Sequence, residues 1–389
     1  MSGEALTLAV APEGEGARDV LRAIRRAVDG PGPAVLLGAP GEVEVPAGTA
    51  AVVTTSGSTG YPKQVVLSRN ALLASAFATA ARIGEGAWLL ALPAGYVAGL
   101  QVLVRALMAG HEPAVLEGRF SPAAFAAAAT GMRSSRGGDR IPSFTSLVPA
   151  QLADVVAAAE ADAGVAAALA SFEAILIGGQ ALPQQIAERA TALGARIVRT
   201  YGSTETSGGC VYDGVPLDGV RMRIADGEVQ LAGPTLADGY LGDPERTASV
   251  FTTDDNGTRW YRTGDAGRID DGVLRVTGRI DNVIVSGGVN VSLDRVERVV
   301  RSLSGLAGAV VVGVADERWG ETPVVAVAGA EEALPDRLAE VREAVGAELG
   351  APARPARIVV LPVLPQLPSG KPDRVALRRL LNGPHGRRD

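Results

Sequence analysis

Residues 54–63 of this chain read TTSGSTGYPK, and they directly follow the apolar stretch 51–53. Glycines let backbone N–H groups turn towards an anion, hydroxyl groups add donors, and the ammonium of Lys63 adds charge. A flexible Ser/Thr/Gly linker has a similar composition, but it would need neither an apolar strand before it nor Pro-Lys at its end. We therefore predict a phosphate-binding loop made of Thr55, Ser56, Gly57, Ser58, Thr59, Gly60 and Lys63.

Lysine is rare in this chain. Of the 37 basic residues only Lys63 and Lys371 are lysine, and Lys371 lies in a second glycine-containing loop, LPSGKPDR (367–374). Arginine offers a planar fork and lysine a compact point charge, so the two are not interchangeable where one ammonium must reach between two oxygens. We expect both lysines to contact phosphate or carboxylate; the alternative is that two lysines remain by chance.

The overall composition limits the class of protein. A chain of 389 residues with 47% hydrophobic and 21% charged residues is long enough for two or three cores and is typical of a soluble globular protein. A net charge of −6 without any basic run argues against a nucleic-acid partner. The single cysteine, Cys210, fits a reducing compartment. The N-terminus does not resemble a signal peptide and no apolar run reaches about 18 residues, so we expect a cytoplasmic protein without a membrane span.

Scarce residues exclude several mechanisms. His111, His385 and Cys210 are too few to build a zinc site of the Cys/His type. Gly-x-Ser-x-Gly, Gly-x-Gly-x-x-Gly and Walker-loop patterns are missing, which disfavours serine hydrolases, dehydrogenases and P-loop NTPases. We interpret Cys210 as a small packed residue rather than a nucleophile.

The first two thirds of the chain alternate apolar strands with alanine-rich helices. We predict a helix over 100–108 and further helices that open at Pro149 and Pro183, where proline suits the first turn. We expect strands at 88–92, 144–148, 174–177 and 197–200. This alternation indicates an α/β fold with covered, largely parallel or mixed sheets. The polar stretch 132–140 is interpreted as a surface loop.

The pattern changes near residue 220. Short strands at 221–224, 228–231 and 273–276 are separated by Asp-Gly turns, which predicts a small β-barrel-like subdomain over 220–281. Residues 282–389 form an α+β segment large enough to fold alone. In it we predict helices at 293–302 and 337–349 and strands at 309–314, 324–328 and 358–361. The predicted organisation is an N-terminal domain (1–281) and a small mobile C-terminal domain (282–389).

Two more loops carry chemistry. In 201–205 an aromatic ring, hydroxyl groups and Glu205 could serve a base, a phosphate and Mg²⁺. Residues 261–265 (YRTGD) place Asp265 in a tight turn, where it either accepts both hydroxyls of a ribose or makes a structural Asx turn. Residues 278–281 and 286–290 bracket the boundary between the two predicted domains, where a hinge would lie.

The ordered motifs TSGSTGYPK, IGGQALP, TYGSTET, YRTGD, GRIDNVIVSGGVNV and PSGK resemble the adenylate-forming superfamily of acyl-CoA synthetases, adenylation domains and beetle luciferases. The resemblance covers roughly residues 50–380, and six motifs in one order are far more specific than any single motif. Within this superfamily, residues 200–220 and the stretch LLALPAGYVAGLQVLVRALMAG (89–110) are most similar to the short actinobacterial 2-succinylbenzoate–CoA ligases of menaquinone biosynthesis.

The resemblance assigns roles within the nucleotide site. Ser56 to Gly60 and Lys63 would contact the β- and γ-phosphates of ATP. Thr204 would bind the α-phosphate, Glu205 the Mg²⁺, and Asp265 with Arg279 the ribose. The adenine slot would be formed by Gly178, Gly179, Gln180 and Tyr201.

The resemblance also implies two half-reactions. A carboxylate would attack the α-phosphorus of ATP, giving an acyl-adenylate and pyrophosphate, with Lys371 bridging the two anions. CoA would then take the acyl group after the small domain rotates about Asp281. That rotation would remove Lys371 and bring Gly287 and Gly288 to the path of the CoA thiol arm.

The acyl substrate is expected to be an aromatic carboxylic acid. In the resembled ligases an arginine at the position of Arg105 approaches the carboxylate that is not activated; the alternative is an exposed charge on an amphipathic helix. Ser207, Gly208 and Gly209 would line the same pocket. Tyr96 stands where this family usually carries histidine.

Other functions stay open at this point. The chain could be another acyl- or aryl-CoA ligase, or an adenylation enzyme that loads a carrier protein. It could also be a nucleotide-binding protein with a decayed site, although Lys63, Glu205, Asp265 and Lys371 together argue against decay. Oligomeric state is not encoded in any motif, and a homodimer is the default expectation for a soluble enzyme.

Overall fold

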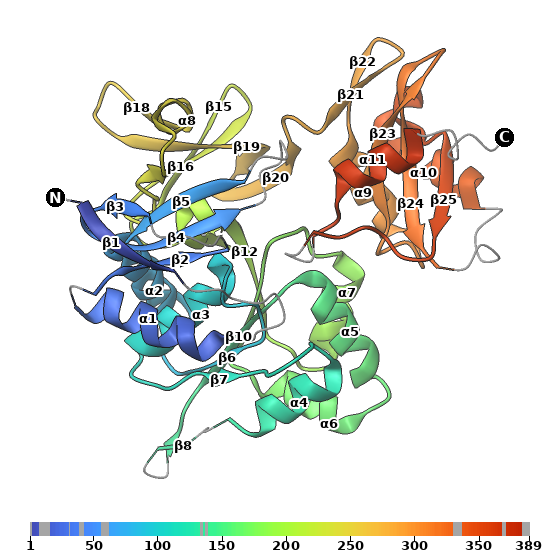
Figure 1. The fold of residues 1–389 in the computed structure, drawn as a ribbon. Helices are drawn as coiled ribbons and strands as arrows, with labels where there is room; N and C mark the ends of the chain where they lie inside the picture. The colour runs from blue at the N-terminus through green and yellow to red at the C-terminus, as the bar shows by residue number, and fades with distance from the viewer. Residues whose placement is uncertain are drawn as a thin grey trace.

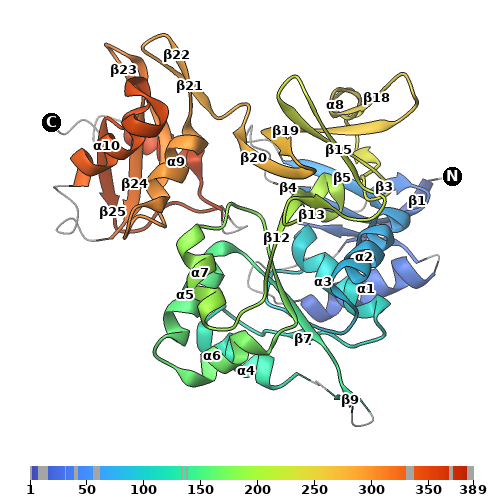
Figure 2. The same ribbon diagram turned by 180° about the vertical axis from the view of Figure 1, so that it is seen from behind.

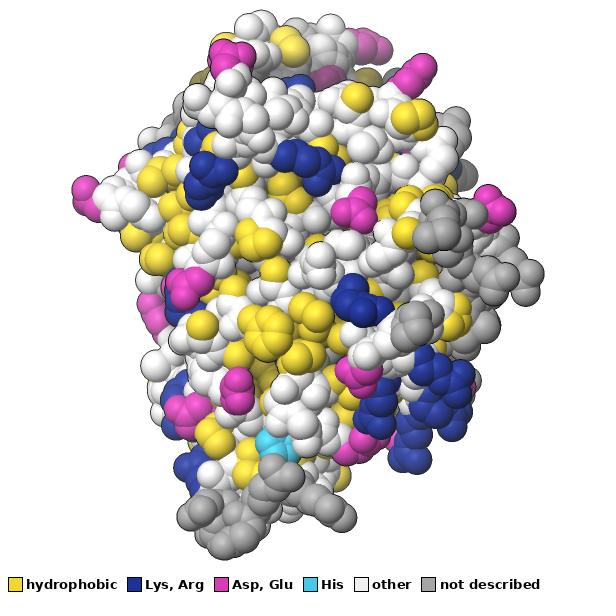
Figure 3. Space-filling view, turned by 90° about the vertical axis from the view of Figure 1, so that its left-hand side faces the viewer, with side chains coloured by type: hydrophobic (Ala, Val, Ile, Leu, Met, Phe, Trp, Pro, Cys, Tyr) yellow, Lys and Arg dark blue, Asp and Glu magenta, His cyan; other side chains and the backbone are white. Residues whose placement is uncertain are grey.

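The structure is a computed structural model. It describes residues 2–7, 16–30, 32–38, 43–55, 62–132, 135–136, 139–329, 337–367 and 371–382. In its described part no helix is long and apolar enough to cross a membrane. On the face shown in Figure 3, acidic and basic side chains are interspersed with exposed apolar ones.

Two sheets form the larger part of the molecule (Figures 1 and 2). The first has the order β17-β5-β4-β2-β1-β3. Its strands are β1 (Ser2–Thr7), β2 (Ala34–Leu37), β3 (Glu44–Pro46), β4 (Thr49–Thr55), β5 (Lys63–Ser68) and β17 (Gly239–Tyr240). The second has the order β14-β13-β12-β11-β10-β6-β7. Its strands are β6 (Ala87–Leu90), β7 (Ala114–Val115), β10 (Ser143–Leu147), β11 (Ala174–Ile177), β12 (Ile197–Ser203), β13 (Gly208–Tyr212) and β14 (Val215–Pro216).

Helices cover both faces of the second sheet. The first group lies between the two sheets and comprises α1 (Ala17–Asp29), α2 (Arg69–Ile83) and α3 (Val97–Met108). The second group covers the opposite face and comprises α4 (Pro122–Thr130), α5 (Pro149–Ala159), α6 (Ala163–Ser171) and α7 (Gln184–Ala192). Alternation along a strand explains this: Trp88 and Leu90 of β6 join the core against the first group, and Leu89 joins the core against the second. The prediction of covered, mixed sheets is confirmed.

A third, five-stranded antiparallel sheet follows. It contains β15 (Arg221–Ala225), β16 (Glu228–Ala232), β18 (Phe251–Thr253), β19 (Arg259–Asp270) and β20 (Val273–Arg279), with α8 (Pro244–Val250) beside it. The Asp-Gly turns Asp226-Gly227 and Asp271-Gly272 have positive φ at both residues, which is the conformation that two-residue hairpins require. The small hairpin of β8 (Ser135–Arg136) and β9 (Asp139–Arg140) lies within the stretch that we interpreted as a surface loop.

The C-terminal part has its own sheet, of β21 (Val283–Ser286), β22 (Val289–Ser292), β23 (Val310–Asp316), β24 (Gly320–Ala328) and β25 (Arg357–Leu361). Its helices are α9 (Leu293–Ser302), α10 (Arg337–Leu349) and α11 (Arg374–Asn382). The apolar cores of this part contain no residue before Ile284, and the other cores contain none after Leu274. An independent core is what a separate domain requires, and Figure 1 shows this part as a distinct lobe.

Candidate active site

Strand β12 delivers the first group of site residues. It ends in a short 3-10 helix, η1 (Thr204–Thr206), whose Thr204 and Glu205 are both buried. The Tyr240 hydroxyl donates to Glu205 Oε1 at 2.9 Å. No hydrogen bond from any described residue reaches Glu205 Oε2, so one carboxylate oxygen is free for another ligand. The expectation of a loop at 201–203 is wrong: these residues continue β12, because they pair with β13.

Lys63 lies on the first sheet, beside the tyrosine that binds Glu205. It begins β5 and pairs with Thr55 at the end of β4, so the predicted phosphate loop is the connection of an antiparallel hairpin. Its ammonium lies 5.4 Å from the centre of the Tyr240 ring, within the range of a cation–π interaction. Ser56, Gly57, Ser58, Thr59 and Gly60 lie outside the described residues, and their role stays a prediction.

Asp265 is the second carboxylate of the site. It lies within β19, so the expectation of a tight turn is wrong; the strand continues because Asp265 pairs with Arg279 of β20. The Tyr201 hydroxyl donates to Asp265 Oδ2 at 2.7 Å, and Arg279 Nη1 lies 3.4 Å from Oδ1. Burial raises the pKa of Asp265, and the hydrogen bond from Tyr201 opposes that shift.

Arg279 connects Asp265 to the predicted hinge. Its Nε and Nη2 donate to the two oxygens of Asp281 at 2.9 and 3.0 Å. This bidentate pair is the main reason why the pKa of Arg279 is raised and that of Asp281 is lowered. Nη1 also donates to the carbonyl of Thr263 at 2.9 Å, which helps to hold the guanidinium beside Asp265.

Lys371 reaches this site from the C-terminal part of the chain. The backbone bridge between Gln366 and Pro372 and the hydrogen bond from Leu367 N to Lys371 O fix its backbone against residues 366 and 367. A Cβ built on Gly179 would lie 3.9 Å from Lys371 Cε, so the lysine stem passes close to the end of β11. Although solvent reaches part of the residue, desolvation lowers the pKa of the Lys371 ammonium, and the charges of Asp265 and Glu205 partly offset this. Lys371 therefore lies beside Gly179 within electrostatic range of Asp265 and Glu205, and Lys63 lies against Tyr240, whose hydroxyl donates to Glu205.

Gly178 and Gly179 are positions where a larger residue is disfavoured. A Cβ on Gly178 would lie 2.5 Å from Thr200 Oγ1, so no side chain fits there. Gly179 has φ of +82°, a conformation that favours glycine. Because β11 and β12 are parallel neighbours, Gly178, Gly179 and Gln180 follow β11 next to Tyr201, as the predicted adenine slot requires.

Helix α3 and strand β13 form the wall of the predicted acyl pocket. Gly208 faces Val97 and Gln101 of α3, and one turn further Arg105 Nη2 donates to the Tyr212 hydroxyl at 3.3 Å. Tyr96 precedes the helix, and burial raises the pKa of its hydroxyl. Ser207, with φ of +54°, turns the chain from η1 into β13 and is fully buried. Gly209 packs against Thr200 and Tyr212.

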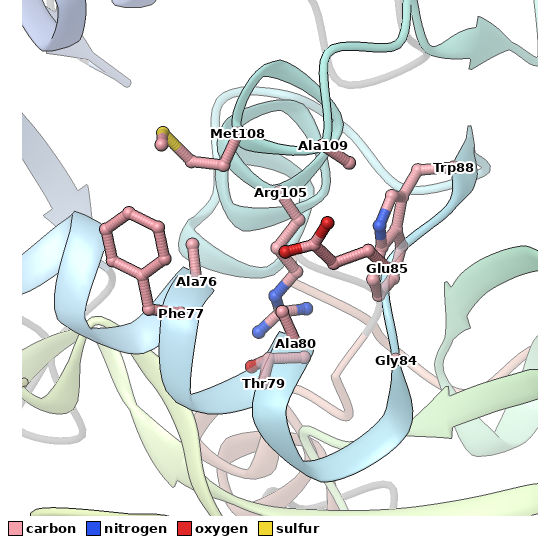
Figure 4. A pocket seen from close by; sticks show the side chains of 10 residues that line it. All are labelled: Ala76, Phe77, Thr79, Ala80, Gly84, Glu85, Trp88, Arg105, Met108 and Ala109. Carbon is pink, nitrogen blue, oxygen red and sulfur yellow. The ribbon is translucent and has the colours of Figure 1, made fainter.

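Arg105 is buried, with only 7% of its surface exposed. Its guanidinium carbon lies 5.3 Å from the centre of the Trp88 ring, and its Nε has no hydrogen-bond partner among the described residues. No described carboxylate lies within ion-pair distance, and desolvation lowers the pKa of Arg105. Figure 4 shows the guanidinium pointing towards Thr79 and Ala80 of α2 in a small pocket. The alternative of an exposed charge is therefore wrong.

The two glycines predicted to shape the CoA path lie away from the nucleotide site. Gly287 and Gly288 form the β21–β22 turn, which stands at the end of the C-terminal lobe farthest from α5 and α7 (Figure 1). Gly287 lies so close to Trp319 that an added Cβ would be 2.5 Å from its ring.

Cys210 is fully buried, which raises the pKa of its thiol to about 12 and confirms that it is a packed residue.

Sequence reasoning missed two tyrosines. Tyr240 contacts both Lys63 and Glu205, and Tyr212 contacts both Arg105 and Thr79. Each lies in a strand among apolar residues, where tyrosine is as common in a core as in a site. No motif in the sequence marked either tyrosine.

Comparisons with known proteins agree with this geometry. Residues 12–241 match the family of AMP-binding enzymes, and residues 295–371 match the AMP-binding enzyme C-terminal domain. The chain belongs to the AMP-binding enzyme family. The predicted adenylate-forming superfamily is therefore confirmed.

Individual relatives show which members of the family the chain resembles. The chain is 40% identical to the probable 2-succinylbenzoate–CoA ligase of Mycobacterium tuberculosis over 391 residues, covering 96% of this chain and 97% of the relative. The structure of the o-succinylbenzoate CoA synthetase of Bacillus subtilis, in complex with its acyl-adenylate intermediate, matches with a TM-score of 0.73 and 25% identity, covering 96% of this chain and 87% of that one. An amide bond synthetase from Marinactinospora thermotolerans matches with a TM-score of 0.74 and 27% identity, covering 97% and 80%. The predicted resemblance to 2-succinylbenzoate–CoA ligases is confirmed.

Proposed function

We propose that this chain is an ATP-dependent 2-succinylbenzoate–CoA ligase that works in two half-reactions. The observation that carries the proposal is that Lys371, from the C-terminal lobe, lies beside Gly179 of the large lobe, within electrostatic range of Asp265 and Glu205. The relatives named above for the same activity support it over nearly the whole chain.

In the first half-reaction a carboxylate oxygen of the acid attacks the α-phosphorus of ATP, and the bond to the β-phosphate oxygen breaks. The products are an acyl-adenylate and pyrophosphate. Two anions must approach each other in this step, so an ammonium between them lowers the barrier most in a site that excludes water. Lys371 supplies that ammonium, and Lys63 stays with the departing pyrophosphate.

The nucleotide would be held by groups on β11, β12, β19 and β20. Asp265 accepts hydrogen bonds from the ribose hydroxyls, held in place by Tyr201 and Arg279. The adenine ring would lie next to Tyr201, along the segment that follows β11 and contains Gly178 and Gly179. Thr204 offers a hydroxyl to the α-phosphate.

Glu205 fits a role as Mg²⁺ ligand. One of its oxygens is free of described partners, and Mg²⁺ usually binds one or two carboxylates together with substrate phosphates. Among the described residues no cluster of three acidic, cysteine or histidine side chains exists, which agrees with a metal held partly by ATP. When bound, the ion would neutralise charge on the phosphates.

In the second half-reaction the thiol of CoA attacks the acyl carbonyl and AMP leaves. Lys371 occupies that approach, so the C-terminal domain (282–389) would rotate on the N-terminal domain (1–281) about Asp281. The rotation would carry the β21–β22 turn, with Gly287 and Gly288, towards the path of the thiol arm. We assign the enzyme to the cytoplasm, where ATP and CoA are available, and a homodimer stays the default expectation.

Arg105 would bind the second carboxylate of the substrate. A buried cation without a carboxylate partner is costly in the free enzyme, and a dianionic acid would supply the missing anion. Gly208, Gln101 and Val97 would bound the space between the reacting carbonyl and Arg105.

The test is carboxylate-dependent ATP–pyrophosphate exchange over a panel of acids, followed by detection of CoA thioesters. We expect 2-succinylbenzoate to support exchange and thioester formation more efficiently than benzoate, succinate or a fatty acid. Exchange with benzoate or a fatty acid but none with 2-succinylbenzoate would overturn the substrate assignment and favour another aryl- or acyl-CoA ligase. Exchange without any thioester would favour a carrier protein as acceptor.

A further inference from the structure

Helix α9 carries all three side-chain hydrogen bonds that join the two lobes among the residues the structure describes. The backbone N–H of Arg279 donates to Asp294 Oδ2 at 2.7 Å. Arg298 Nη2 donates to the carbonyl of Thr277 at 2.7 Å, and Gln185 Nε2 of α7 donates to the carbonyl of Ser302 at 2.9 Å. Figures 1 and 2 both show α9 on the side of the C-terminal lobe that faces the rest of the molecule.

Asp294 makes the innermost of these contacts. Its side chain is 21% exposed, and its second oxygen accepts a bond from Asn282 Nδ2 at 2.7 Å. The fit against β20 is close, because a Cβ built on Gly278 would lie 2.8 Å from Asp294 Cβ. Asp294 therefore joins α9 to the same residue, Arg279, whose guanidinium holds Asp265 and Asp281.

A chain of charged contacts connects Asp294 to Lys371. Arg374, three residues after Lys371, donates from Nη2 to Glu297 Oε2 at 2.8 Å and lies 3.8 Å from Asp294 Oδ1. Arg374 Nη1 also donates to the carbonyl of Val311 at 2.7 Å. The segment from Lys371 to Arg374 is thus fixed to α9, and α9 is fixed to β20.

We propose that Asp294 is a positioning residue for adenylation: its bond to the Arg279 backbone latches α9 onto β20 and so holds Lys371 at the active site. This inference rests on the proposed function, in which Lys371 serves the first half-reaction only. Asp294 follows the hinge and Arg279 precedes it, so rotation about Asp281 must break this bond. The latch stabilises one orientation of the C-terminal domain and contributes nothing to the other.

The decisive experiment compares half-reactions in full-length variants. Asp294→Ala should lower 2-succinylbenzoate-dependent ATP–pyrophosphate exchange by about tenfold, as expected for a lost hydrogen bond to a charged group. Thioester formation from supplied acyl-adenylate and CoA should stay near the wild-type rate. Arg298→Ala should show the same selectivity with a smaller loss of about threefold. Arg295→Ala is the matched control, because Arg295 is exposed on the same helix without a partner among described residues, and it should change neither rate.

A second measurement follows domain orientation directly. Cys210 is fully buried, so spin labels at Glu188→Cys on α7 and Arg342→Cys on α10 would report one interdomain distance. We expect one dominant distance in the parent protein and a second population after Asp294→Ala. If Asp294→Ala does not fold, the same measurements are made on Arg298→Ala, which changes an exposed side chain.

The outcomes separate the two proposals. Equal loss of both half-reactions, or unchanged exchange and an unchanged distance in Asp294→Ala, would overturn the latch. Lys371→Ala serves as the reference: if it leaves exchange intact, the assignment of Lys371 fails and with it the two-step function. If Lys371→Ala abolishes exchange while Asp294→Ala does not affect it, the function stands and only the latch is lost.

Discussion

Arg105 is a buried cation whose nearest polar contact is a tyrosine hydroxyl. Removing its charge in the free enzyme should cost little stability, since a buried unpaired charge is itself unfavourable. In the complex with a dicarboxylate, the same charge makes a charge-assisted hydrogen bond worth about 1.5–3 kcal/mol. The role of Arg105 should therefore appear in substrate binding rather than in folding.

We predict that Arg105→Gln raises the KM for 2-succinylbenzoate by about 10- to 100-fold and hardly changes the KM for a monocarboxylate analogue. Steady-state kinetics with both acids and thermal unfolding of the variant measure these effects. Tyr212→Phe is the matched control, because it keeps the ring against Arg105 and removes only the hydroxyl. A KM that rises equally for both acids would show that Arg105 shapes the pocket without binding the second carboxylate.

Rarity and motif order marked Lys63, Lys371, Glu205 and Asp265 in the sequence, and their roles stay predictions. In the structure Lys371 lies beside Gly179, and Lys63 lies against Tyr240, which donates to Glu205. The sequence could not show whether Arg105 is buried or exposed, since one charged residue in an apolar helix gives the same pattern in an amphipathic helix and in a fully covered one. Only the packing of α3 between α2 and the second sheet showed that it is buried.

Helix α9 also organises the core of its own lobe. Glu297 is 6% exposed, and it accepts hydrogen bonds from Val311 N at 2.9 Å and from Arg374 at 2.8 Å. Its other oxygen pairs with Arg301 at 2.9 Å. Removing one member of a buried ionic network leaves the others without a counter-charge, which costs far more than breaking an exposed pair.

We predict that Glu297→Ala lowers the free energy of unfolding of the C-terminal domain by about 3 kcal/mol. The control is Glu340→Ala on α10, whose pair with Arg337 involves a glutamate side chain that is 50% exposed. That change should leave the free energy of unfolding nearly unchanged, because exposed ion pairs contribute little. Denaturant unfolding, followed for both variants in the full chain, measures the difference, and equal costs would contradict the burial argument.

Elements were predictable where periodicity was strong. Helix α9 and helix α10 have the predicted bounds, and β11 does as well. The errors fall where a strand contains glycine and polar residues, as in β12 after Thr200 and in β19 at Asp265. Both strands carry a register shift there, and this irregularity lets polar side chains face the site while the backbone stays paired. Pairing between distant strands leaves no local signal in the sequence.

The relative orientation of the two lobes could not be predicted from the sequence at all. The motifs place Lys371 and the pair Gly287 and Gly288 on the same domain, and either could face the large domain. The structure has Lys371 beside Gly179, within electrostatic range of Asp265 and Glu205, with the β21–β22 turn at the far end. This arrangement is set by a few hydrogen bonds from α9 to β20 and α7, so it depends on tertiary contacts alone. It is the orientation that the first half-reaction needs.

We predict that the two half-reactions differ in their response to alkaline pH. Desolvation lowers the pKa of Lys371, so its ammonium loses the proton at a lower pH than the ordinary lysine value of about 10.4. Adenylation needs the charged form, and ATP–pyrophosphate exchange should therefore fall on the alkaline side with an apparent pKa below that value. Thioester formation from supplied acyl-adenylate does not use Lys371, and it should hold or rise as the CoA thiol ionises.

Rates of both half-reactions between about pH 7 and 10.5, spanning the thiol and lysine ranges, measure this difference. In Lys371→Ala the residual exchange should lack the alkaline fall, because the titrating group is gone. Lys371→Arg keeps its charge over this range and should remove the fall as well, at a lower rate set by its different shape. Two results would contradict this prediction: the same apparent pKa for the rates of both half-reactions, or a loss of exchange at alkaline pH that persists in Lys371→Ala. Either result would mean that the titrating group is not Lys371 but one that stays in the site in both domain orientations.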